Sequence, residues 1–216
     1  MIILGVDPGS RLTGYGVIQV PEGARQVDVT SKVLAQGTLR LANTGGRAVI
    51  PLERRLLSIH QGLSQVVREF RPDVMVIEKV FFAKNPLSAL KLGQARGAAI
   101  VSAAIHGLQV VEYSPSEVKL SIVGHGHADK GQVAQMLRRR LGDAELEFAT
   151  EDASDGLALA VCHAERLLRA PGLASRSLEI RRETRRTRGL AESLGLHEGQ
   201  ISERRLSARD LRSKKS

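Results

Sequence analysis

The sequence predicts an α/β domain built on a mixed sheet flanked by helices, with antiparallel strands first and parallel strands later. Three observations support this prediction. Three strand-like segments follow one another at the N-terminus, helical and strand-like segments alternate after them, and an amphipathic helix closes the pattern near residue 168. Strands joined by short turns pair antiparallel, whereas strands separated by helices pair parallel. The active site of such a domain is expected near the strand ends.

The first forty residues predict three strands. Residues 2–7 (IILGVD) form an apolar run typical of a buried strand, and residues 14–20 (GYGVIQV) predict a second strand. The Gly-rich turn between them predicts a hairpin. A third strand is expected within residues 29–41, where VLAQGTLRL alternates apolar and polar side chains.

Helices and strands alternate from there. Residues 51–70 carry apolar side chains at helical spacing, and residues 74–80 (VMVIEKV) predict a strand that begins buried and ends on Glu78. Asn85 begins an Asn-Pro pair that suits an N-cap and a first helical turn. The helix that it opens is expected over residues 86–106 and is rich in Ala and Gly, which permits close approach of another backbone or subunit.

The last third of the domain predicts one more strand and three helices. The strand is LQVVEY, and the spacing of a capping box follows it at Ser114 and again at Asp129. The second of these boxes opens a helix through Leu141. The final helix is expected over residues 152–168, with an apolar stripe toward the core.

Composition divides the chain into two parts. Residues 1–170 are expected to form one domain, whereas residues 171–216 show no sustained apolar stripe and are expected to be a flexible tail. The tail holds twelve Lys or Arg and six Asp or Glu, so it supplies most of the net charge of +9. A basic balance favours a polyanionic partner.

Cysteine use and hydropathy predict a cytoplasmic protein. Cys162 is the single cysteine, so an intramolecular disulfide is impossible and a reducing compartment is favoured; its mid-helix place suits packing. Asp7 interrupts the apolar N-terminus, which is unlike a signal peptide. No apolar run approaches the roughly 20 residues that a membrane-spanning helix requires.

Four acidic residues stand out by their context. Asp7 ends the first strand, Glu78 ends the fourth, and Asp152 and Asp155 lie three apart at the start of the last helix. Each has an ordinary explanation as a turn former, an exposed strand end or a complement to the helix dipole. Their occurrence together is more informative, because the first and fourth strands can lie side by side with the helix over their ends, which would bring the four acids to one place.

Four carboxylates at one point repel each other unless cations neutralise them, and oxygen ligands suit Mg²⁺ or Mn²⁺. Two such ions about 4 Å apart can activate a water and stabilise the leaving oxygen of a phosphodiester. The histidines of the GHGH loop, His125 and His127, are an alternative metal pair, although two histidines in a glycine loop more often bind nothing.

The hairpin GVDPGSRLTGYG has two interpretations. It can carry a metal-binding Asp7, with glycines that let a DNA backbone approach the ions, or it can cradle the phosphates of ATP, as in phosphotransferases of the actin and sugar-kinase type. The chain is short for the two lobes of those enzymes and shows no second phosphate loop. The acids elsewhere favour the metal site.

Five segments together resemble the RuvC family of Holliday junction resolvases: GVDPGSRLTGYG, IEKVFFAKN, ALKLGQARG, VKLSIVGHGHADKGQV and DASDGLALAVCH. The resemblance covers residues 1–168 in consistent order. It implies a ribonuclease H-like fold and a homodimer that cuts two opposing strands of a four-way DNA junction symmetrically, with Mg²⁺ or Mn²⁺. It leaves open a ribonuclease of the same fold and a non-catalytic junction binder; the intact set of four acids argues against the binder.

The resemblance also assigns residues. By position, the acidic tetrad of the family is Asp7, Glu78, Asp152 and Asp155, although some members have histidine where this chain has Asp152. Phe81 matches an aromatic residue that contacts unpaired bases, and stacking of this kind contributes about 1–3 kcal/mol per base. Lys119 and Lys130 match basic positions that face DNA. Phe82, next to Phe81, could assist that contact or could instead pack in the core. Weaker candidates for DNA contacts are Arg47, Lys84, Lys91 and Arg96.

The family resemblance implies partners as well. Helix 86–106 matches the dimerisation element, and the family works with the RuvA junction-binding protein and the RuvB branch-migration motor. The tail, 171–216, lies outside the match. It is expected to add non-specific DNA affinity, to bind a partner, or to be a tolerated extension.

Overall fold

The structure is a computed structural model that describes residues 1–9, 11–21, 31–40, 50–79 and 86–169, with five single residues farther on. Along the described chain the elements are β1 (Ile2–Pro8), β2 (Leu12–Gln19), β3 (Lys32–Arg40), α1 (Leu52–Phe70), β4 (Val74–Glu78), α2 (Pro86–Ile105), β5 (Gln109–Tyr113), α3 (Pro115–Val123), α4 (Lys130–Leu141) and α5 (Glu151–Arg169). The element order confirms the alternation that the sequence predicts.

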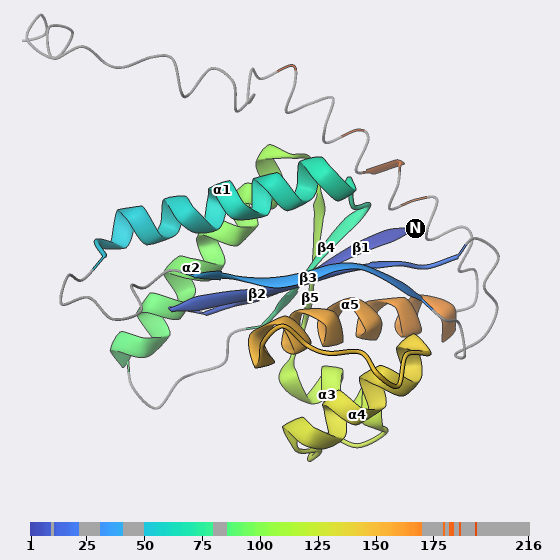
Figure 1. The fold of residues 1–216 in the computed structure, drawn as a ribbon. Coiled ribbons are helices and arrows are strands. Elements are labelled where there is room, and N and C mark those ends of the chain that lie inside the picture. The colour runs from blue at the N-terminus through green and yellow to red at the C-terminus, as the bar shows by residue number, and fades with distance from the viewer. Residues whose placement is uncertain are drawn as a thin grey trace, which may run out of the picture.

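The five strands form one mixed sheet in the order β3-β2-β1-β4-β5 (Figure 1). β1 pairs antiparallel with β2, which confirms the predicted hairpin, and β2 pairs antiparallel with β3. β4 pairs parallel with β1 on one side and with β5 on the other. β1 and β4 are therefore neighbours whose chains run in the same direction, so their carboxyl ends meet at one edge.

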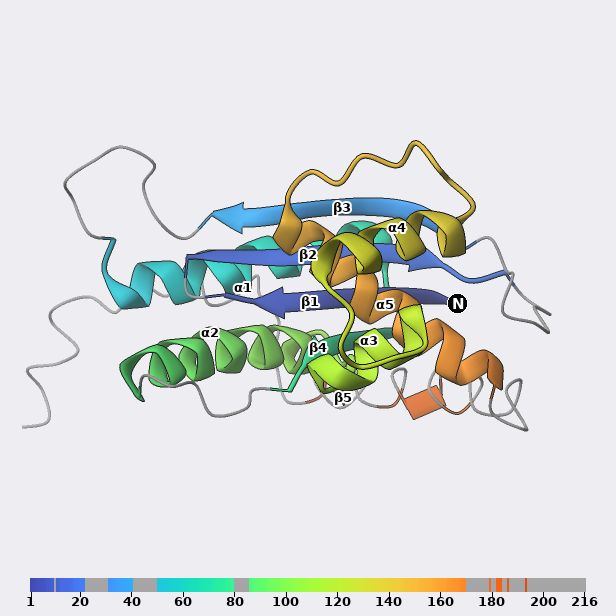
Figure 2. The same cartoon turned by 90° about the horizontal axis from the view of Figure 1, so that it is seen from below.

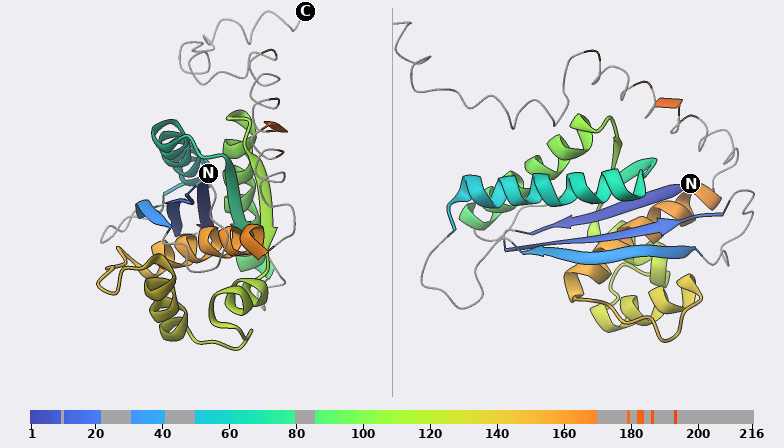
Figure 3. Two further views of the ribbon diagram at one scale, coloured as in Figure 1. Left: turned by 90° about the vertical axis from the view of Figure 1, so that its right-hand side faces the viewer. Right: turned by 45° about the horizontal axis from the view of Figure 1, so that its top comes forward.

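Helices cover both faces of the sheet (Figures 1 and 3). α1 and α2 lie on one face, where alternate strand residues such as Leu4, Val17 and Met75 pack beneath them. α5 crosses the other face over residues such as Ile3 and Ile18, and α3 and α4 lie beyond α5 (Figure 2). The alternation follows from strand geometry, because successive side chains point to opposite faces.

A seam of glycines lets α5 press against the backbone of β1 and β2. A Cβ added to Gly14 would meet the carbonyl oxygen of Asp152 at 1.8 Å, and one added to Gly5 would meet that of Gly156 at 2.0 Å. A Cβ on Gly16 would strike Leu157. These hairpin glycines thus make room for α5, whereas the sequence interpretation gave them to an approaching DNA backbone. The space they leave is filled from within the domain.

Local signals set the starts of α3 and α4 as predicted. Ser114 and Asp129 each accept a hydrogen bond from the backbone N–H of the third helical residue, and the side chain of that residue accepts one from the backbone N–H of the capping residue.

Cys162 is buried in the core, as its position predicts. Among the described residues, no helix combines the length and the apolar character needed to cross a bilayer.

Candidate active site

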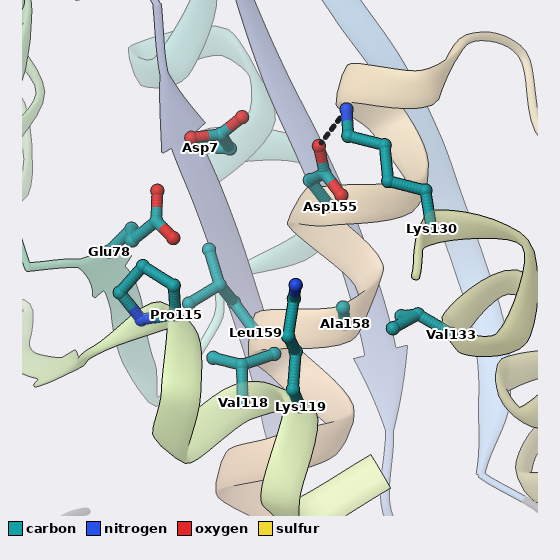
Figure 4. Close-up of a pocket in the computed structure, with 10 residues that line it drawn as sticks. All are labelled: Asp7, Glu78, Pro115, Val118, Lys119, Lys130, Val133, Asp155, Ala158 and Leu159. Atoms are coloured by element: carbon teal, nitrogen blue, oxygen red, sulfur yellow. Dashed lines mark hydrogen bonds and ion pairs between the residues drawn. The ribbon is translucent and has the colours of Figure 1, made fainter. Parts of the chain in front are cut away.

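Two carboxylates lie together at the carboxyl edge of the sheet. Glu78 is the last residue of β4, and Asp7 is the last but one of β1. Their predecessors Val6 and Ile77 are paired in the parallel register, so the two acidic side chains follow at the same level (Figure 4). Sheet pairing alone brings together two residues that are far apart in the sequence.

The first turns of α5 bring the other two acids to the same edge. The glycine seam holds the backbone of Asp152 against Gly14, the strand residue paired with Asp7. Asp155, one turn later, stands across the opening from Asp7 and Glu78, with its carboxylate paired to Lys130 (Figure 4). Asp155 lines the pocket there, whereas Asp152 is not among its lining residues. Asp152 acts on the site through its charge, as the pKa of Asp7 shows.

The acids border a pocket of about 290 Å³ between the strand ends and the helices α3, α4 and α5. Its floor is apolar, and two lysines stand at its sides, Lys119 from α3 and Lys130 from α4 (Figure 4). The pocket is thus lined by Asp7, Glu78, Asp155, the two lysines and the apolar residues Pro115, Val118, Val133, Ala158 and Leu159.

Burial and mutual repulsion disfavour ionisation of the acids that line the pocket. Burial first, and then the charges of Glu78, Asp155 and Asp152, together raise the pKa of Asp7 to about 7, and the charge of Lys130 opposes them. Burial and the charge of Asp155 likewise raise the pKa of Glu78. The pKa of Asp155 is raised too, first by burial. Such a cluster favours whatever cation or proton relieves the repulsion.

Lys130 supplies part of that relief. Its Nζ lies 3.4 Å from a carboxylate oxygen of Asp155 and 3.2 Å from one of Glu151, and the charge of Asp155 raises the pKa of the ammonium group. The lysine is largely exposed, so this pair is weak and exchangeable. Lys119 is close enough to Glu78 to lower its pKa. Both lysines therefore stand where the phosphates of a polyanion can compete with the acids.

The donor set suits a hard divalent cation. Asp7, Glu78 and Asp155 offer only oxygen atoms, face one pocket and carry the like charges that a cation would neutralise. Their side chains have not closed into a ligand group: within the described parts of the chain, no three His, Cys, Asp or Glu residues are placed to hold a metal ion together. Asp155 instead pairs with Lys130. His125 and His127 are exposed and belong to no such group either.

Comparison with known proteins identifies the family of this chain. Residues 3–163 match the family model described as crossover junction endodeoxyribonuclease RuvC. This chain belongs to the RuvC family. The crossover junction endodeoxyribonuclease RuvC of Geobacter sulfurreducens is 49% identical over 164 residues, which are 76% of this chain and 92% of that protein. The one of Idiomarina loihiensis is 45% identical over 183 residues, 83% of this chain and 98% of its own.

Solved RuvC structures share the fold. The Thermus thermophilus RuvC structure superposes with a TM-score of 0.66 at 33% identity, covering 76% of this chain and 94% of that one. T. thermophilus RuvC in complex with a Holliday junction substrate gives a TM-score of 0.64 at 30% identity, with the same coverage. The expected ribonuclease H-like fold is confirmed. As a RuvC-family enzyme, the chain is a nuclease that depends on divalent metal ions.

The remaining DNA-contact candidates divide into three groups. Phe81, Phe82, Lys84 and Arg47 lie outside the described residues, as does nearly all of the tail. Lys91 is exposed on α2. Arg96, which the sequence offered as a weak DNA candidate, is turned into the protein, where it contacts the backbone of Glu78 and the side chain of Glu112.

Sequence reasoning missed two features of this RuvC-family site. Glu151 shares Lys130 with Asp155, and its place directly before Asp152 was the only signal for it. The apolar floor of the pocket comes from α3, α4 and α5, whose residues look like ordinary core positions in the sequence. Neither feature can be found without knowing which faces of these helices turn toward the acids.

Proposed function

We propose that this chain resolves Holliday junctions in recombination and repair by paired, symmetric nicks in two opposing strands. The observation that carries this proposal is the pocket that places Asp7, Glu78 and Asp155 opposite Lys119 and Lys130. Acids of this kind serve phosphodiester hydrolysis, and the flanking lysines serve to hold a nucleic acid backbone. Membership of the RuvC family supports four-way junction DNA as the substrate.

We propose that Asp7, Glu78, Asp152 and Asp155 together hold the divalent ions, two Mg²⁺ or Mn²⁺ per site. Bound ions of this type supply an activated water and stabilise the leaving oxygen. The chain itself contributes the carboxylates, and the raised pKa values of Asp7, Glu78 and Asp155 make proton release part of ion binding. Lys130 releases Asp155 and contacts a phosphate when DNA binds, because its ion pair with Asp155 is solvent-exposed and therefore weak.

The DNA contacts extend beyond the pocket. We assign phosphate contacts to Lys119, Lys130 and Lys84, and stacking on unpaired bases at the junction centre to Phe81, with Phe82 beside it. Phosphate contacts position the substrate without reading its sequence. Stacking selects a distorted junction over a paired duplex, because only unpaired bases present a free face to an aromatic ring.

The working unit is a homodimer formed through α2. One face of α2 exposes Leu87, Leu90 and Val101 at helical spacing, with exposed fractions of 67%, 60% and 54%. Gly93 and Gly97 have open space where a Cβ would stand, so a second helix can approach closely. A two-fold dimer matches the near two-fold symmetry of a four-way junction and places two sites on opposing strands.

RuvA and RuvB are the proposed partners at the junction, and the cytoplasm is the proposed compartment, because it holds the DNA that they act on. The basic tail is proposed to add sequence-independent affinity for DNA. Its charge supports this role, since residues 171–216 contribute +6 of the net +9.

One experiment tests the central proposal. The protein is incubated with a labelled four-way junction, a linear duplex and an RNA–DNA hybrid, each with Mg²⁺, Mn²⁺ or EDTA. We expect symmetric nicks in the junction alone, lost in EDTA and in Asp7→Asn. Equal cutting of the linear duplex, or preferred cutting of the hybrid, overturns the assignment of substrate.

A further inference from the structure

Arg96 lies on the side of α2 that faces the sheet. It is nine positions after Leu87, which is about half a turn around the helix axis, so it points away from the exposed leucines. Its side chain is only 20% exposed. An arginine that is mostly covered needs partners for its charge and its donors, and the structure supplies them at the ends of β4 and β5.

The guanidinium group of Arg96 bridges two adjacent strands. Its Nε donates to the backbone carbonyl oxygen of Glu78 at 3.2 Å, at the end of β4. A terminal nitrogen pairs with the carboxylate of Glu112, near the end of β5. Glu112 is the sheet partner of Ile77, the residue before Glu78. The flat, forked head of an arginine can make both contacts at once.

The contact with Glu78 completes a clamp on one peptide unit. The carbonyl of the Glu78–Lys79 peptide accepts from Arg96, and the N–H of the same peptide donates to the carbonyl oxygen of Tyr113 at 2.8 Å. With both polar groups held, the peptide plane cannot turn about the Glu78 backbone. The direction in which the Glu78 side chain leaves the strand is fixed as a result.

We propose that Arg96 is a positioning residue, which orients Glu78 for its role in the acidic site by clamping the Glu78–Lys79 peptide between α2 and β5. The inference rests on the proposed function, because it takes Glu78 to be a metal-binding carboxylate. Arg96 itself contacts neither DNA nor metal. It acts through the backbone, as residues outside a ligand set do when they orient the ligands.

The test uses Mn²⁺ binding rather than cleavage alone. Mn²⁺ affinity is measured calorimetrically for the full-length protein and for Arg96→Gln, Arg96→Lys and Glu112→Gln. Arg96→Gln removes both contacts, and we expect Mn²⁺ to bind about tenfold more weakly. Arg96→Lys can reach one partner but not both, and Glu112→Gln keeps the bond to Glu78, so smaller losses are expected. Arg54→Gln, at an exposed arginine of α1, is the matched control and should bind Mn²⁺ like the parent protein.

Two further readouts separate positioning from other roles. Amide hydrogen exchange of the segment Val74–Lys79 should become faster in Arg96→Gln, while exchange in β1 stays the same. Junction binding in EDTA should be unchanged. If Arg96→Gln weakens junction binding in EDTA and leaves Mn²⁺ affinity intact, Arg96 is a DNA contact and the proposal is wrong.

The design also separates this inference from the proposed function. If the parent protein binds no Mn²⁺, or if Asp7→Asn binds it equally well, the metal site itself has been misassigned. Suppose instead that the parent binds Mn²⁺ and Asp7→Asn does not. If Arg96→Gln then matches the parent in Mn²⁺ affinity and in amide hydrogen exchange, only the proposed role of Arg96 is wrong. Should Arg96→Gln fail to fold, Arg96→Lys and Glu112→Gln carry the same comparison.

Discussion

The carbonyl oxygen of Asp152 occupies the place where a side chain on Gly14 would begin, since an added Cβ would lie 1.8 Å from it. The two atoms cannot coexist. Backbone at the start of α5 would have to move away from β2, and both Asp152 and Asp155 would move with it. The glycine therefore determines how closely the last helix approaches the acids of the strands.

Gly14→Ala is expected to be among the most damaging small substitutions in the domain. It should lower the free energy of unfolding by about 3 kcal/mol or more, as forced overpacking of a core does, and should abolish junction cleavage. Denaturant unfolding measures the first effect. Gly126→Ala is the control, because a Cβ added to Gly126 would lie no nearer than 3.8 Å to another atom, which is ordinary van der Waals contact. Equal stability of the two variants would contradict the steric argument.

Asp7→Asn should stabilise the metal-free protein at high pH. The pKa of Asp7 rises from 3.8 in the unfolded chain to about 7 in the folded protein, so ionisation of this group opposes folding. Stability is highest while the carboxyl group is protonated at low pH, falls as the pH rises above 3.8, and has lost this contribution once the pH has risen through 7. Three pKa units correspond to at most about 4 kcal/mol, and we expect about 2 kcal/mol at pH 8, because solvent screens part of it. In EDTA, Tm should then rise by roughly 4–8 °C at pH 8 and by less at pH 5.

The same substitution should act in the opposite direction when Mn²⁺ is present. A ligand that binds only the folded state raises its stability, and Asp7→Asn removes part of that binding. Adding Mn²⁺ at pH 8 should thus raise the Tm of the parent more than that of the variant. Proton uptake by Asp7 should also weaken Mn²⁺ binding as the pH falls below about 7. A binding constant that does not change between pH 6 and pH 8 would be evidence against Asp7 as a ligand.

Lys119→Ala and Lys130→Ala should each weaken junction binding for all sequences equally. Each lysine is proposed to contact one phosphate, and a dimer carries two copies. The slope of log affinity against log salt should therefore fall by about two for either variant. Binding measured in Ca²⁺ or EDTA over a range of salt gives the slope. Arg139→Ala, at an exposed arginine of the last turn of α4, should leave the slope unchanged.

Leu90→Glu should convert the dimer to a monomer. Leu90 is 60% exposed on the proposed pairing face, where a buried charge would be unpaired. Sedimentation velocity measures the change, and the monomer should release junctions with a single nick. Leu120→Glu is the matched control, because Leu120 is 54% exposed but lies on α3. If both variants keep the parent's mass, α2 is not the interface.

Deletion of residues 171–216 should weaken binding to any DNA and leave metal-dependent junction cleavage in place. The tail carries twelve basic and six acidic residues, so its loss removes charge but none of the proposed metal ligands. A chain with a Gly/Ser-rich replacement of equal length controls for length alone. Loss of cleavage at saturating DNA would show that the tail belongs to the catalytic unit.

Sequence patterns were sufficient to predict the elements and to place Asp7 and Glu78 at strand ends. Asp7 and Glu78 lie at strand ends in the sequence itself, and the order of strands and helices limits which strands can be neighbours. The capping residues Ser114 and Asp129 mark their helices by local chemistry alone. These signals survive folding because each depends on neighbours only a few positions away.

What the sequence did not reveal depends on contacts between distant residues. Gly14 faces Asp152 because of the angle at which α5 crosses the sheet, which no local pattern encodes. Lys130 pairs with Asp155 only because α4 ends up beside α5. In the sequence, Arg96 cannot be distinguished from a basic residue that contacts DNA. Its contact with Glu78 follows from the rotation of α2 about its own axis.

The glycine seam also sets the order in which the proposed metal site is assembled during synthesis. Asp7 and Glu78 are synthesised first, and Asp152 and Asp155 join them only when the last helix packs against Gly14 and Gly16. Under the proposed assignment, a nascent chain therefore lacks two of its four metal ligands until α5 has been translated.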